Sequence, residues 1–388
     1  MKRKRRRNYR NLKPKPHGRA YADGSEFGLR KLHARASALN YALRLEDHYS
    51  RKFGQVVTAI GILKTLSVIS SHFKKNWRLW VLNVAPSRHL KSKTSEEQRA
   101  IFGRRKLVYL GSDFTIHGLF RDYDSGRKID RKCLLVNDTT LLLASKAKQA
   151  KSRLIDAFSE LGSEGRYIYR DFQKSFEIKA TFSLIANITP HSFLVNRERR
   201  LGNTFVERCL VVYHALTEEE MSEANINRDR REAMKMEKFR PCLHEEDVKV
   251  NKKDLVRFND YARRWRLLGA YSSSSSLFDM IKSVAVAYAI LSGNRRITQA
   301  EYRFLDMLEP HLQNPEESVK LSILELAHQG RSIKEICLVL NKDYEKYRPF
   351  VSRTLAEYRQ KGLLPWPQKV LQAGRLATRG NGEYNKLE

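Results

Sequence analysis

The chain has 388 residues and a formal net charge of +31, because 74 lysines and arginines outnumber 43 aspartates and glutamates. At about one domain per ~150 residues, this length predicts two or three units. No apolar run reaches the ~18–20 residues that span a bilayer, so no membrane partner is expected. The four cysteines stand far apart, which argues against a disulfide scaffold or a zinc site and favours a reducing compartment. A charge this high predicts a polyanionic partner such as nucleic acid.

Residues 1–28 are predicted to form a basic, disordered arm. The first nineteen residues contain ten lysines and arginines and no acid, and the mutual repulsion of these charges opposes folding. Such an arm is expected to bind phosphates, with a solubilising tail as the alternative. In a eukaryotic host it would serve as a nuclear address; otherwise the expected location is cytoplasmic or nucleoid-associated.

Residues 29–216 are predicted to form an α/β core with a largely parallel sheet. Apolar residues recur at helical spacing over 29–73. Short apolar runs then alternate with helical stretches, which is the pattern of parallel strands joined by crossover helices. Strands are expected at 77–84, 133–138, 180–187 and 209–213.

The remainder of the chain is predicted to be mainly helical. Thr298 is expected to cap one helix, and a helix-turn-helix of the winged kind is expected near the C-terminus. The predicted divisions are a charged helix and linker at 217–250, an all-α lid at 251–314, the helix-turn-helix at 315–366 and a loose basic tail at 367–388.

A candidate phosphate-binding loop follows the first predicted strand. Such a loop needs a tight turn with exposed backbone N–H groups, then a lysine and a hydroxyl residue at a helix start, which meet the phosphates and Mg²⁺. Lys91 and Ser92 have these positions, although Ala85 and Leu90 replace the two glycines of the motif. A register on Lys93 is the alternative. The residues expected to bind nucleotide are Ala85, Pro86, Ser87, Leu90, Lys91 and Ser92.

Three further polar residues stand at the edges of predicted strands. Asp138 follows a strand and is expected to hold Mg²⁺ with Ser92, and Asn187 is expected to position the attacking water. Arg208 precedes the last strand and is expected to reach the phosphate of a neighbouring subunit. The structural alternatives are a turn residue, a strand cap and a surface charge. The order of the four residues along the chain favours a catalytic set of Lys91, Asp138, Asn187 and Arg208.

These stretches resemble the AAA+ ATPase core of phage and mobile-element replication helicases, which are related to the minichromosome-maintenance helicases. The resemblance covers residues 50–216, less than half of the chain. It implies a P-loop AAA+ fold, ATP and Mg²⁺ as cofactors, and a homo-oligomeric ring, of which a hexamer is one form. In that family the stretches are, in order, Walker A, the segment after the first helix, Walker B, the hairpin leading into sensor 1 and the arginine-finger strand. Here they read "APSRHLKS" after "LWVLNV", "GSDFTIHGLF", "KCLLVNDTT", "FSELGSEGRYIYRDFQKSFEIKATFSLIANITP" and "LGNTFVERCLVVY".

The sequence departs from that family directly after Asp138. Walker B usually ends in Asp-Glu, and the glutamate acts as general base, but Thr139 stands in its place. Hydrolysis is therefore expected to be slow, to use a base from elsewhere, or to be absent while ATP still binds.

Two segments are candidate DNA-binding elements. The predicted hairpin 165–180 alternates basic with aromatic residues, which can grip phosphates and stack bases; by resemblance it is the hairpin that enters the channel of a ring. The alternative is an ordinary hairpin with its aromatic face in the core. The second helix of the helix-turn-helix is expected to face a duplex, with protein contacts as the alternative. The expected DNA contacts are Arg166, Arg170, Lys174 and Lys179 in the hairpin and Lys346, Arg348, Arg353 and Arg359 in the helix.

The sequence therefore predicts an ATP-dependent DNA motor that resembles replicative helicases. The alternative is a DNA-binding replication initiator, loader or regulator on a nucleotide-gated or inactive AAA+ core, which the missing glycines and glutamate favour. A structural packaging protein without nucleotide is the third hypothesis, and it explains the charge but not the polar residues at the strand ends. The histidines show no spacing for metal ligands and are expected to be incidental.

Overall fold

The computed structural model covers most of the chain between residues 41 and 364. The residues it describes are 41–75, 77–110, 115–122, 127–139, 148–170, 175–190, 192–193, 202–230, 236–268, 274–313, 319–320, 323, 326–340, 342–360 and 364. The predicted arm at 1–28 and tail at 367–388 lie outside these residues, as does Lys174.

The described strands form two sheets, and the larger one is parallel throughout. Its five strands have the order β2-β3-β6-β1-β7, while β4 and β5 pair as an antiparallel hairpin. Because the five strands are parallel, the loops after β1, β3 and β6 meet at one edge of the sheet. The strands are Trp80–Val84 (β1), Leu107–Tyr109 (β2), Cys133–Val136 (β3), Arg166–Arg170 (β4), Ser175–Lys179 (β5), Ser183–Ile188 (β6) and Cys209–Tyr213 (β7).

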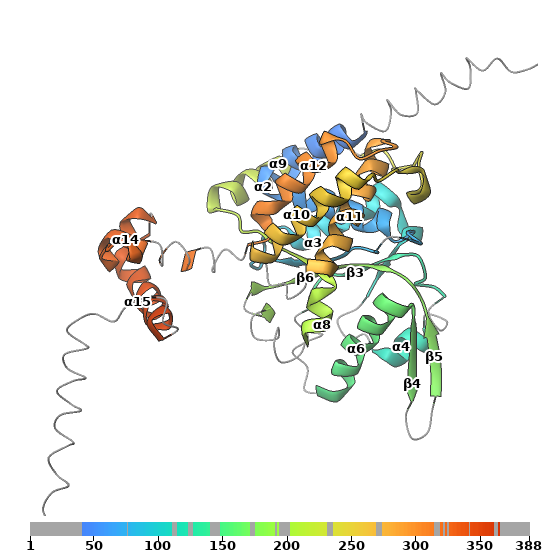
Figure 1. Ribbon diagram of the computed structural model, residues 1–388, viewed down its shortest axis with the longest axis horizontal. Coiled ribbons are helices and arrows are strands. Elements are labelled where there is room, and N and C mark those ends of the chain that lie inside the picture. The colour runs from blue at the N-terminus through green and yellow to red at the C-terminus, as the bar shows by residue number, and fades with distance from the viewer. Residues whose placement is uncertain are drawn as a thin grey trace, which may run out of the picture.

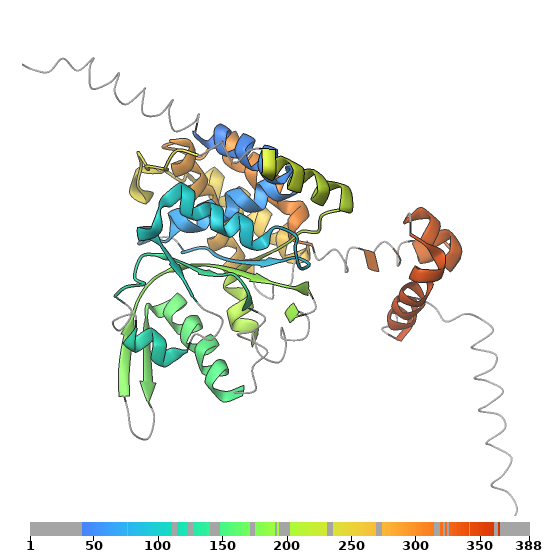
Figure 2. The ribbon, with the colours of Figure 1, turned by 180° about the vertical axis from the view of Figure 1, so that it is seen from behind.

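Helices cover both faces of the larger sheet (Figure 1, Figure 2). One face is covered by α2 (Gln55–Ser70), α3 (Lys91–Phe102), α10 (Lys252–Leu268), α11 (Ser274–Ser292) and α12 (Gln299–Leu308). The other face is covered by α4 (Ile116–Arg121), α6 (Lys148–Glu164), α8 (Gly202–Glu207) and the β4–β5 hairpin. Short 3-10 turns are η1 (Arg104–Lys106), η4 (Glu245–Asp247) and η5 (Glu309–His311).

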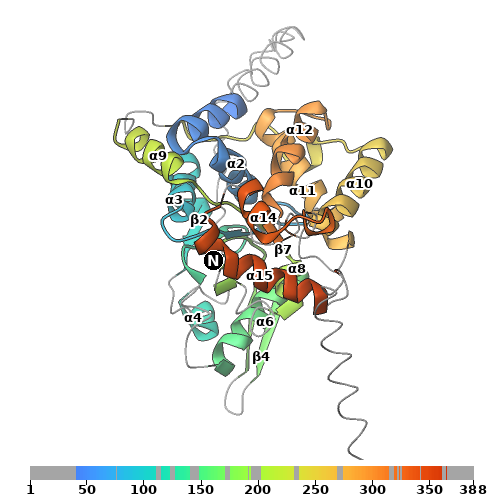
Figure 3. The same cartoon turned by 90° about the vertical axis from the view of Figure 1, so that its left-hand side faces the viewer.

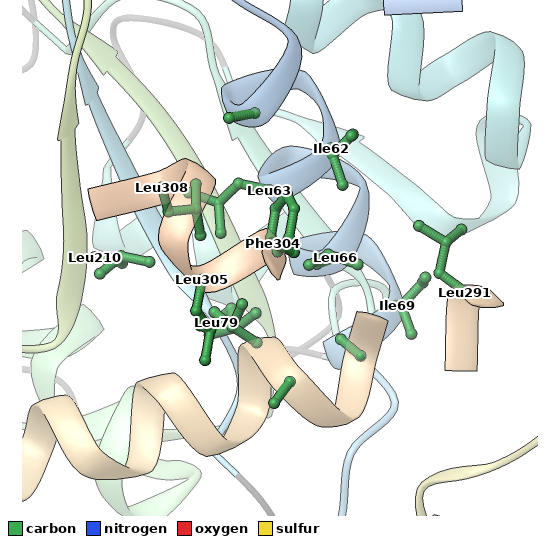
Figure 4. Packing of buried hydrophobic residues seen from close by; sticks show 14 of the residues in the cluster. Ile62, Leu63, Leu66, Ile69, Leu79, Leu210, Leu291, Phe304, Leu305 and Leu308 are labelled. Atoms are coloured by element: carbon green, nitrogen blue, oxygen red, sulfur yellow. The ribbon is translucent and has the colours of Figure 1, made fainter. Parts of the chain in front are cut away.

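The strands of the larger sheet have continuous apolar sequences because both faces of the sheet are buried. Successive side chains of a strand point to opposite sides, so Val81 packs in the cluster with α2, while Trp80 and Leu82 pack in the cluster with α6. Figure 4 shows the first cluster, in which Leu79 and Leu210 lie near leucines of α2 and α12.

The helices predicted as a separate lid share this first core. α11 contacts both α2 and α10. Its window Ser275–Ser292 has a mean hydropathy of 1.3, enough by length and composition alone to cross a membrane, but 67% of that window is buried within the protein. Packing against α2 and α10 accounts for the apolar composition of α11.

The C-terminal helices α14 (Ile333–Val339) and α15 (Tyr344–Gln360) form a small core of their own. Ser332 caps α14 through a capping box with Glu335, and Ile336 packs with Val351 of α15. Two helices joined by a short turn are the central part of a helix-turn-helix. Within 326–340 and 342–360 the structure contains no strand that would form a wing.

The α/β fold with a parallel sheet and a mainly helical C-terminal region is confirmed. Four strands lie within three residues of their predicted bounds, and Thr298 caps α12 through a capping box with Glu301. The predicted helix 29–73 is divided at Gly54, which has a φ of 89° between a helix at 41–53 and α2. Strand β2 was not predicted, because three residues beside the basic turn η1 give no period-2 pattern.

Gly162 of α6 allows the close packing of Trp80. A Cβ atom at 162 would lie 2.7 Å from Cζ2 of this buried indole, which stacks on Phe182 with ring centroids 5.4 Å apart. We expect Gly162→Ala to lower the free energy of unfolding by about 1–2 kcal/mol, although alanine favours a helix, because the crowded indole must move. Urea unfolding measures this, with Ser163→Ala, at an exposed position, expected within about 0.5 kcal/mol of wild type. A Gly162→Ala protein as stable as wild type would contradict the tight contact.

Candidate functional site

The loop between β1 and α3 contains the predicted phosphate-binding residues. The N–H of Ala85 donates to the carbonyl of Ile188 in β6 (3.1 Å), which fixes the loop to the sheet. Arg88 (φ 69°) and Leu90 (φ 59°) have left-handed backbone conformations. For residues other than glycine this conformation costs roughly 1–2 kcal/mol each. At position 90 the loop therefore has a left-handed backbone conformation that a glycine would adopt without this cost, although the residue is a leucine.

Lys91 begins α3, and its ammonium group lies on this loop. The ammonium donates to the carbonyl oxygens of Ala85 and Pro86, the latter at 2.7 Å. Burial lowers the pKa of Lys91, and the nearby charge of Asp138 opposes this shift. Lys93 lines the same cavity as Lys91, but it is exposed and pairs with Glu96 at 3.2 Å. Both observations favour the register on Lys91 over that on Lys93.

A cavity of about 820 Å³ lies between this loop, the ends of β3 and β6, and α9 (Glu218–Arg230). Figure 3 shows α9 beside α3. The volume falls within the ~300–1,000 Å³ of small-molecule sites. Lysine and arginine side chains of the loop and α3 line one side, and the start of α3 adds the positive end of a helix dipole. The lining includes Lys91, Ser92, Asp138, Thr189 and Glu218.

Two polar residues that follow β3 also line the cavity. Asp138 is exposed, whereas Oδ1 of Asn137 is buried and has no hydrogen-bond partner among the described residues. Such an oxygen costs about 1–3 kcal/mol unless water or a ligand satisfies it. Thr139 is buried, and its hydroxyl donates to the carbonyl of Asn187 in the neighbouring strand β6 (2.8 Å). Asn137 was not among the predicted site residues, because the carboxylate of Asp138 directly after it is the more conspicuous ligand.

Asn187 lies behind the cavity rather than on its wall. Its side-chain amide is buried, donates to Oγ of Ser95 (3.1 Å) and accepts from Nζ of Lys64 (3.1 Å). Thr189, two residues further on, lines the cavity and lies 2.9 Å from the hydroxyl of Ser192. The amide of Asn187 therefore braces α3, and Thr189 is the polar residue that this strand end presents to the cavity.

His214, which was expected to be incidental, is part of a buried polar network behind the loop. Its Nε2 donates to the carbonyl of His89 (2.6 Å), and its Nδ1 lies 3.1 Å from Oδ1 of Asn83 in β1. Burial lowers the pKa of His214 to about 3. The imidazole is therefore neutral at pH 7 and connects the end of β7 to the loop between β1 and α3.

This burial predicts a stability that depends on pH. The folded-state pKa of His214 lies below the 6.5 of an exposed histidine, so on acidification the unfolded chain binds the proton first and stability falls as the pH drops below 6.5. Between pH 7 and pH 5 we expect wild type to lose about 2 kcal/mol more than His214→Gln. Urea unfolding at both pH values measures this difference; equal losses would contradict the buried neutral histidine.

Arg208 lies at the opposite edge of the sheet from the loop. It precedes β7, whose first residue pairs with Trp80, so a strand length of about 20 Å separates it from Ala85. Its guanidinium donates to the carbonyl of Ser159 in α6, and burial lowers its pKa. Arg208 therefore does not reach the cavity of its own chain.

Three aromatic residues of β4 and β5 lie in the core. Tyr167, Tyr169 and Phe176 are buried, and Phe176 stacks on Phe120 of α4 with ring centroids 4.3 Å apart. Of the two interpretations of these three aromatic residues, the structure supports core packing over base stacking. The exposed face presents Arg166, Arg170 and Lys179, of which Arg166 and Lys179 form ion pairs with Glu177.

The predicted DNA contacts of the C-terminal region all lie on α15. Lys346, Arg348 and Arg353 are exposed, whereas Arg359 is half-buried and its Nε has no partner among the described residues. The three exposed cations are therefore available to a partner, and Arg359 is less so.

A comparison of the chain with protein-family models finds no match, and a comparison with curated proteins finds no similar sequence.

Proposed function

We propose that the chain is an ATP-dependent DNA motor of the AAA+ type, similar to the replicative helicases of phages and mobile elements. One observation carries this proposal: the ends of β1 and β3, about 50 residues apart in the sequence, bring Lys91, Ser92 and Asp138 to one cavity at the edge of a parallel sheet. Ligands of α/β proteins bind at this edge, where the connections from a central strand leave to either side.

The cavity suits a nucleotide with Mg²⁺. Lys91 and the start of α3 supply the positive charge that phosphates need. Ser92 and Asp138 would hold the ion, and the unsatisfied oxygen of Asn137 lies beside them, which fits the preference of Mg²⁺ for oxygen ligands. No three His, Cys, Asp or Glu side chains converge on a metal site in the described part of the chain, but Mg²⁺ in nucleotide sites takes only one or two carboxylates together with phosphates. When bound, the ion would neutralise charge on the phosphates.

The DNA contacts in this proposal are the cations that the fold leaves exposed. They lie on the outer face of the β4–β5 hairpin and on α15. The formal charge of +31 supports a phosphate-rich partner. Arg208 does not reach the cavity of its own chain. In a homo-oligomeric ring it would act on the nucleotide of a neighbouring subunit instead.

Two observations favour the alternative function, a DNA-binding initiator or regulator whose AAA+ core binds nucleotide without turnover. The ammonium of Lys91 is held by carbonyl oxygens of its own loop, and the hydroxyl of Thr139 is held by Asn187. Hydrolysis needs a general base. Of the described residues that line the cavity, Glu218 on α9 is the carboxylate besides Asp138, and it is the candidate for a base from elsewhere.

ATP turnover by the full chain, with and without single-stranded DNA, separates these functions. A motor should hydrolyse ATP faster when DNA is bound, since hydrolysis is coupled to its movement. Binding of ATP and DNA without any turnover would support the initiator or regulator. Absence of any rise in Tm with ATP and Mg²⁺ would overturn both, because a ligand bound to the folded state must stabilise it.

A further inference from the structure

Lys64 of α2 is a fully buried lysine directly behind the first turn of α3. Its relative exposure is 0%, and it stands in an apolar helix. Its ammonium nitrogen lies within hydrogen-bond distance of four oxygens, all of them uncharged. They are the carbonyl of Lys91 (2.8 Å), the hydroxyls of Thr94 (2.8 Å) and Ser95 (3.0 Å), and Oδ1 of Asn187 (3.1 Å).

No carboxylate balances this ammonium among the described residues. The titratable groups whose charges interact with it are Lys91 on α3 and His214 after β7, and neither is an acid. Burial, and then the charge of Lys91, lower the pKa of Lys64 well below its usual value. Lys52, by comparison, pairs with Glu97 at 2.8 Å. A buried ammonium without a counter-charge costs several kcal/mol, which an anion bound nearby would offset.

The contacts of Lys64 all lead to the phosphate site. Through Lys91, Thr94 and Ser95 it holds the first turn of α3, and through Asn187 it holds the end of β6. The start of α3, whose dipole is positive, therefore has one ammonium on the loop and a second one behind it. This concentration of positive charge is unfavourable in the empty site and favourable around a polyphosphate.

We propose that Lys64 is a positioning residue of the phosphate site: it fixes α3 against β6, and its charge is balanced by the polyphosphate that binds in front of α3. The inference rests on the proposed function, because it requires the loop to bind phosphates. It adds a second, buried cation to the single lysine that the loop motif contains.

Inorganic tripolyphosphate is the probe, because it has the charge of a nucleotide's phosphates without the nucleobase and needs no Mg²⁺. Calorimetry with the full chain at pH 7 should show affinity at least about tenfold weaker in Lys64→Met than in wild type. Lys64→Gln, which keeps N–H donors for the surrounding oxygens but no charge, should show a similar loss. Lys52→Met is the matched control, since it removes a lysine that already has a counter-charge.

The pH profile separates charge balance from simple packing. The bound anion raises the pKa of Lys64, so above the pKa of the empty site the affinity of wild type should fall more steeply with pH than that of either variant. The difference between wild type and Lys64→Met should therefore shrink as the pH rises above that pKa, which titrations at a series of pH values from neutral to alkaline follow. Lys91 also titrates in all these proteins, and because its charge interacts with that of Lys64, its pKa is expected to be higher in both variants than in wild type. Both effects make the affinity of wild type fall more steeply with pH, and both depend on the charge of Lys64 rather than on its packing.

Three results would overturn the inference, and they differ in what they imply for the proposed function. If the Lys64 variants bind as wild type does while Lys91→Ala loses binding, the phosphate site stands and Lys64 has no part in it. If Lys64→Gln is folded, as urea unfolding checks, and its affinity loss is the same across the whole pH series, Lys64 has a packing role only. If wild type binds neither tripolyphosphate nor ATP, the inference and the proposed function are both wrong.

Discussion

Lys91→Ala should reduce DNA-stimulated ATP hydrolysis by about 10²–10³-fold. Lys91 is the lysine at the start of α3, and its ammonium is already held within the loop by Ala85 and Pro86. A bound nucleotide would take the place of these carbonyl oxygens and draw the ammonium to its phosphates. Loss of one charged group that stabilises the transferring phosphate typically lowers kcat by this amount. Steady-state hydrolysis with saturating single-stranded DNA measures the effect, and urea unfolding checks that the variant is folded.

Lys93→Ala is the matched control for this measurement. Lys93 lies two residues further along the same helix and forms an exposed ion pair with Glu96, a contact of little energetic value. We expect hydrolysis within about threefold of wild type. If Lys93→Ala abolishes turnover and Lys91→Ala does not, the loop has the other register. If both variants hydrolyse ATP as wild type does, the activity does not come from this cavity.

The position of the cavity was predictable because strand ends follow from apolar runs. A buried parallel strand has a continuous apolar sequence, so the first polar residue after it marks the edge of the sheet. Asp138 was placed by this argument, and Lys91 and Ser92 by the spacing of a phosphate-binding loop after the strand; all three line one cavity. Strand order was not predictable from the runs themselves. The order depends on where each connection between two strands crosses the sheet, and the residues of a single strand do not determine this.

Contacts across the fold were the part that the sequence did not reveal. Lys64 looks like an exception in an apolar helix, and its role becomes visible only when α3 and β6 lie beside it. In the hairpin, the period-2 spacing of Tyr167 and Tyr169 places both on one face. Which face is buried depends on α4 and α6, which lie elsewhere in the chain. Two features of the sequence could have indicated these contacts: a lysine within an apolar helix, and the alternation of aromatic with basic residues along a strand.

Arg208→Ala should leave ATP binding nearly unchanged and lower hydrolysis by about 10³-fold or more, if Arg208 acts on the nucleotide of a neighbouring subunit. Its own cavity is a strand length away, and its guanidinium is held by the carbonyl of Ser159 in the isolated chain. Formation of a ring would have to release the guanidinium from that carbonyl and turn it toward the next subunit. The guanidinium of Arg208 is charged, and hydrogen bonds between an arginine and a phosphate are among the strong, charge-assisted ones.

Mixing two inactive variants distinguishes this role from a structural one. Lys91→Ala subunits keep Arg208, and Arg208→Ala subunits keep the cavity, so a mixed ring contains some sites with both groups intact. Hydrolysis should therefore reappear on mixing. If Arg208 serves only to satisfy the carbonyl of Ser159, its removal costs stability within each chain, which urea unfolding detects and no neighbouring subunit can restore. Activity that stays lost on mixing, together with a lower free energy of unfolding, would assign Arg208 to the packing of α6 against the start of β7.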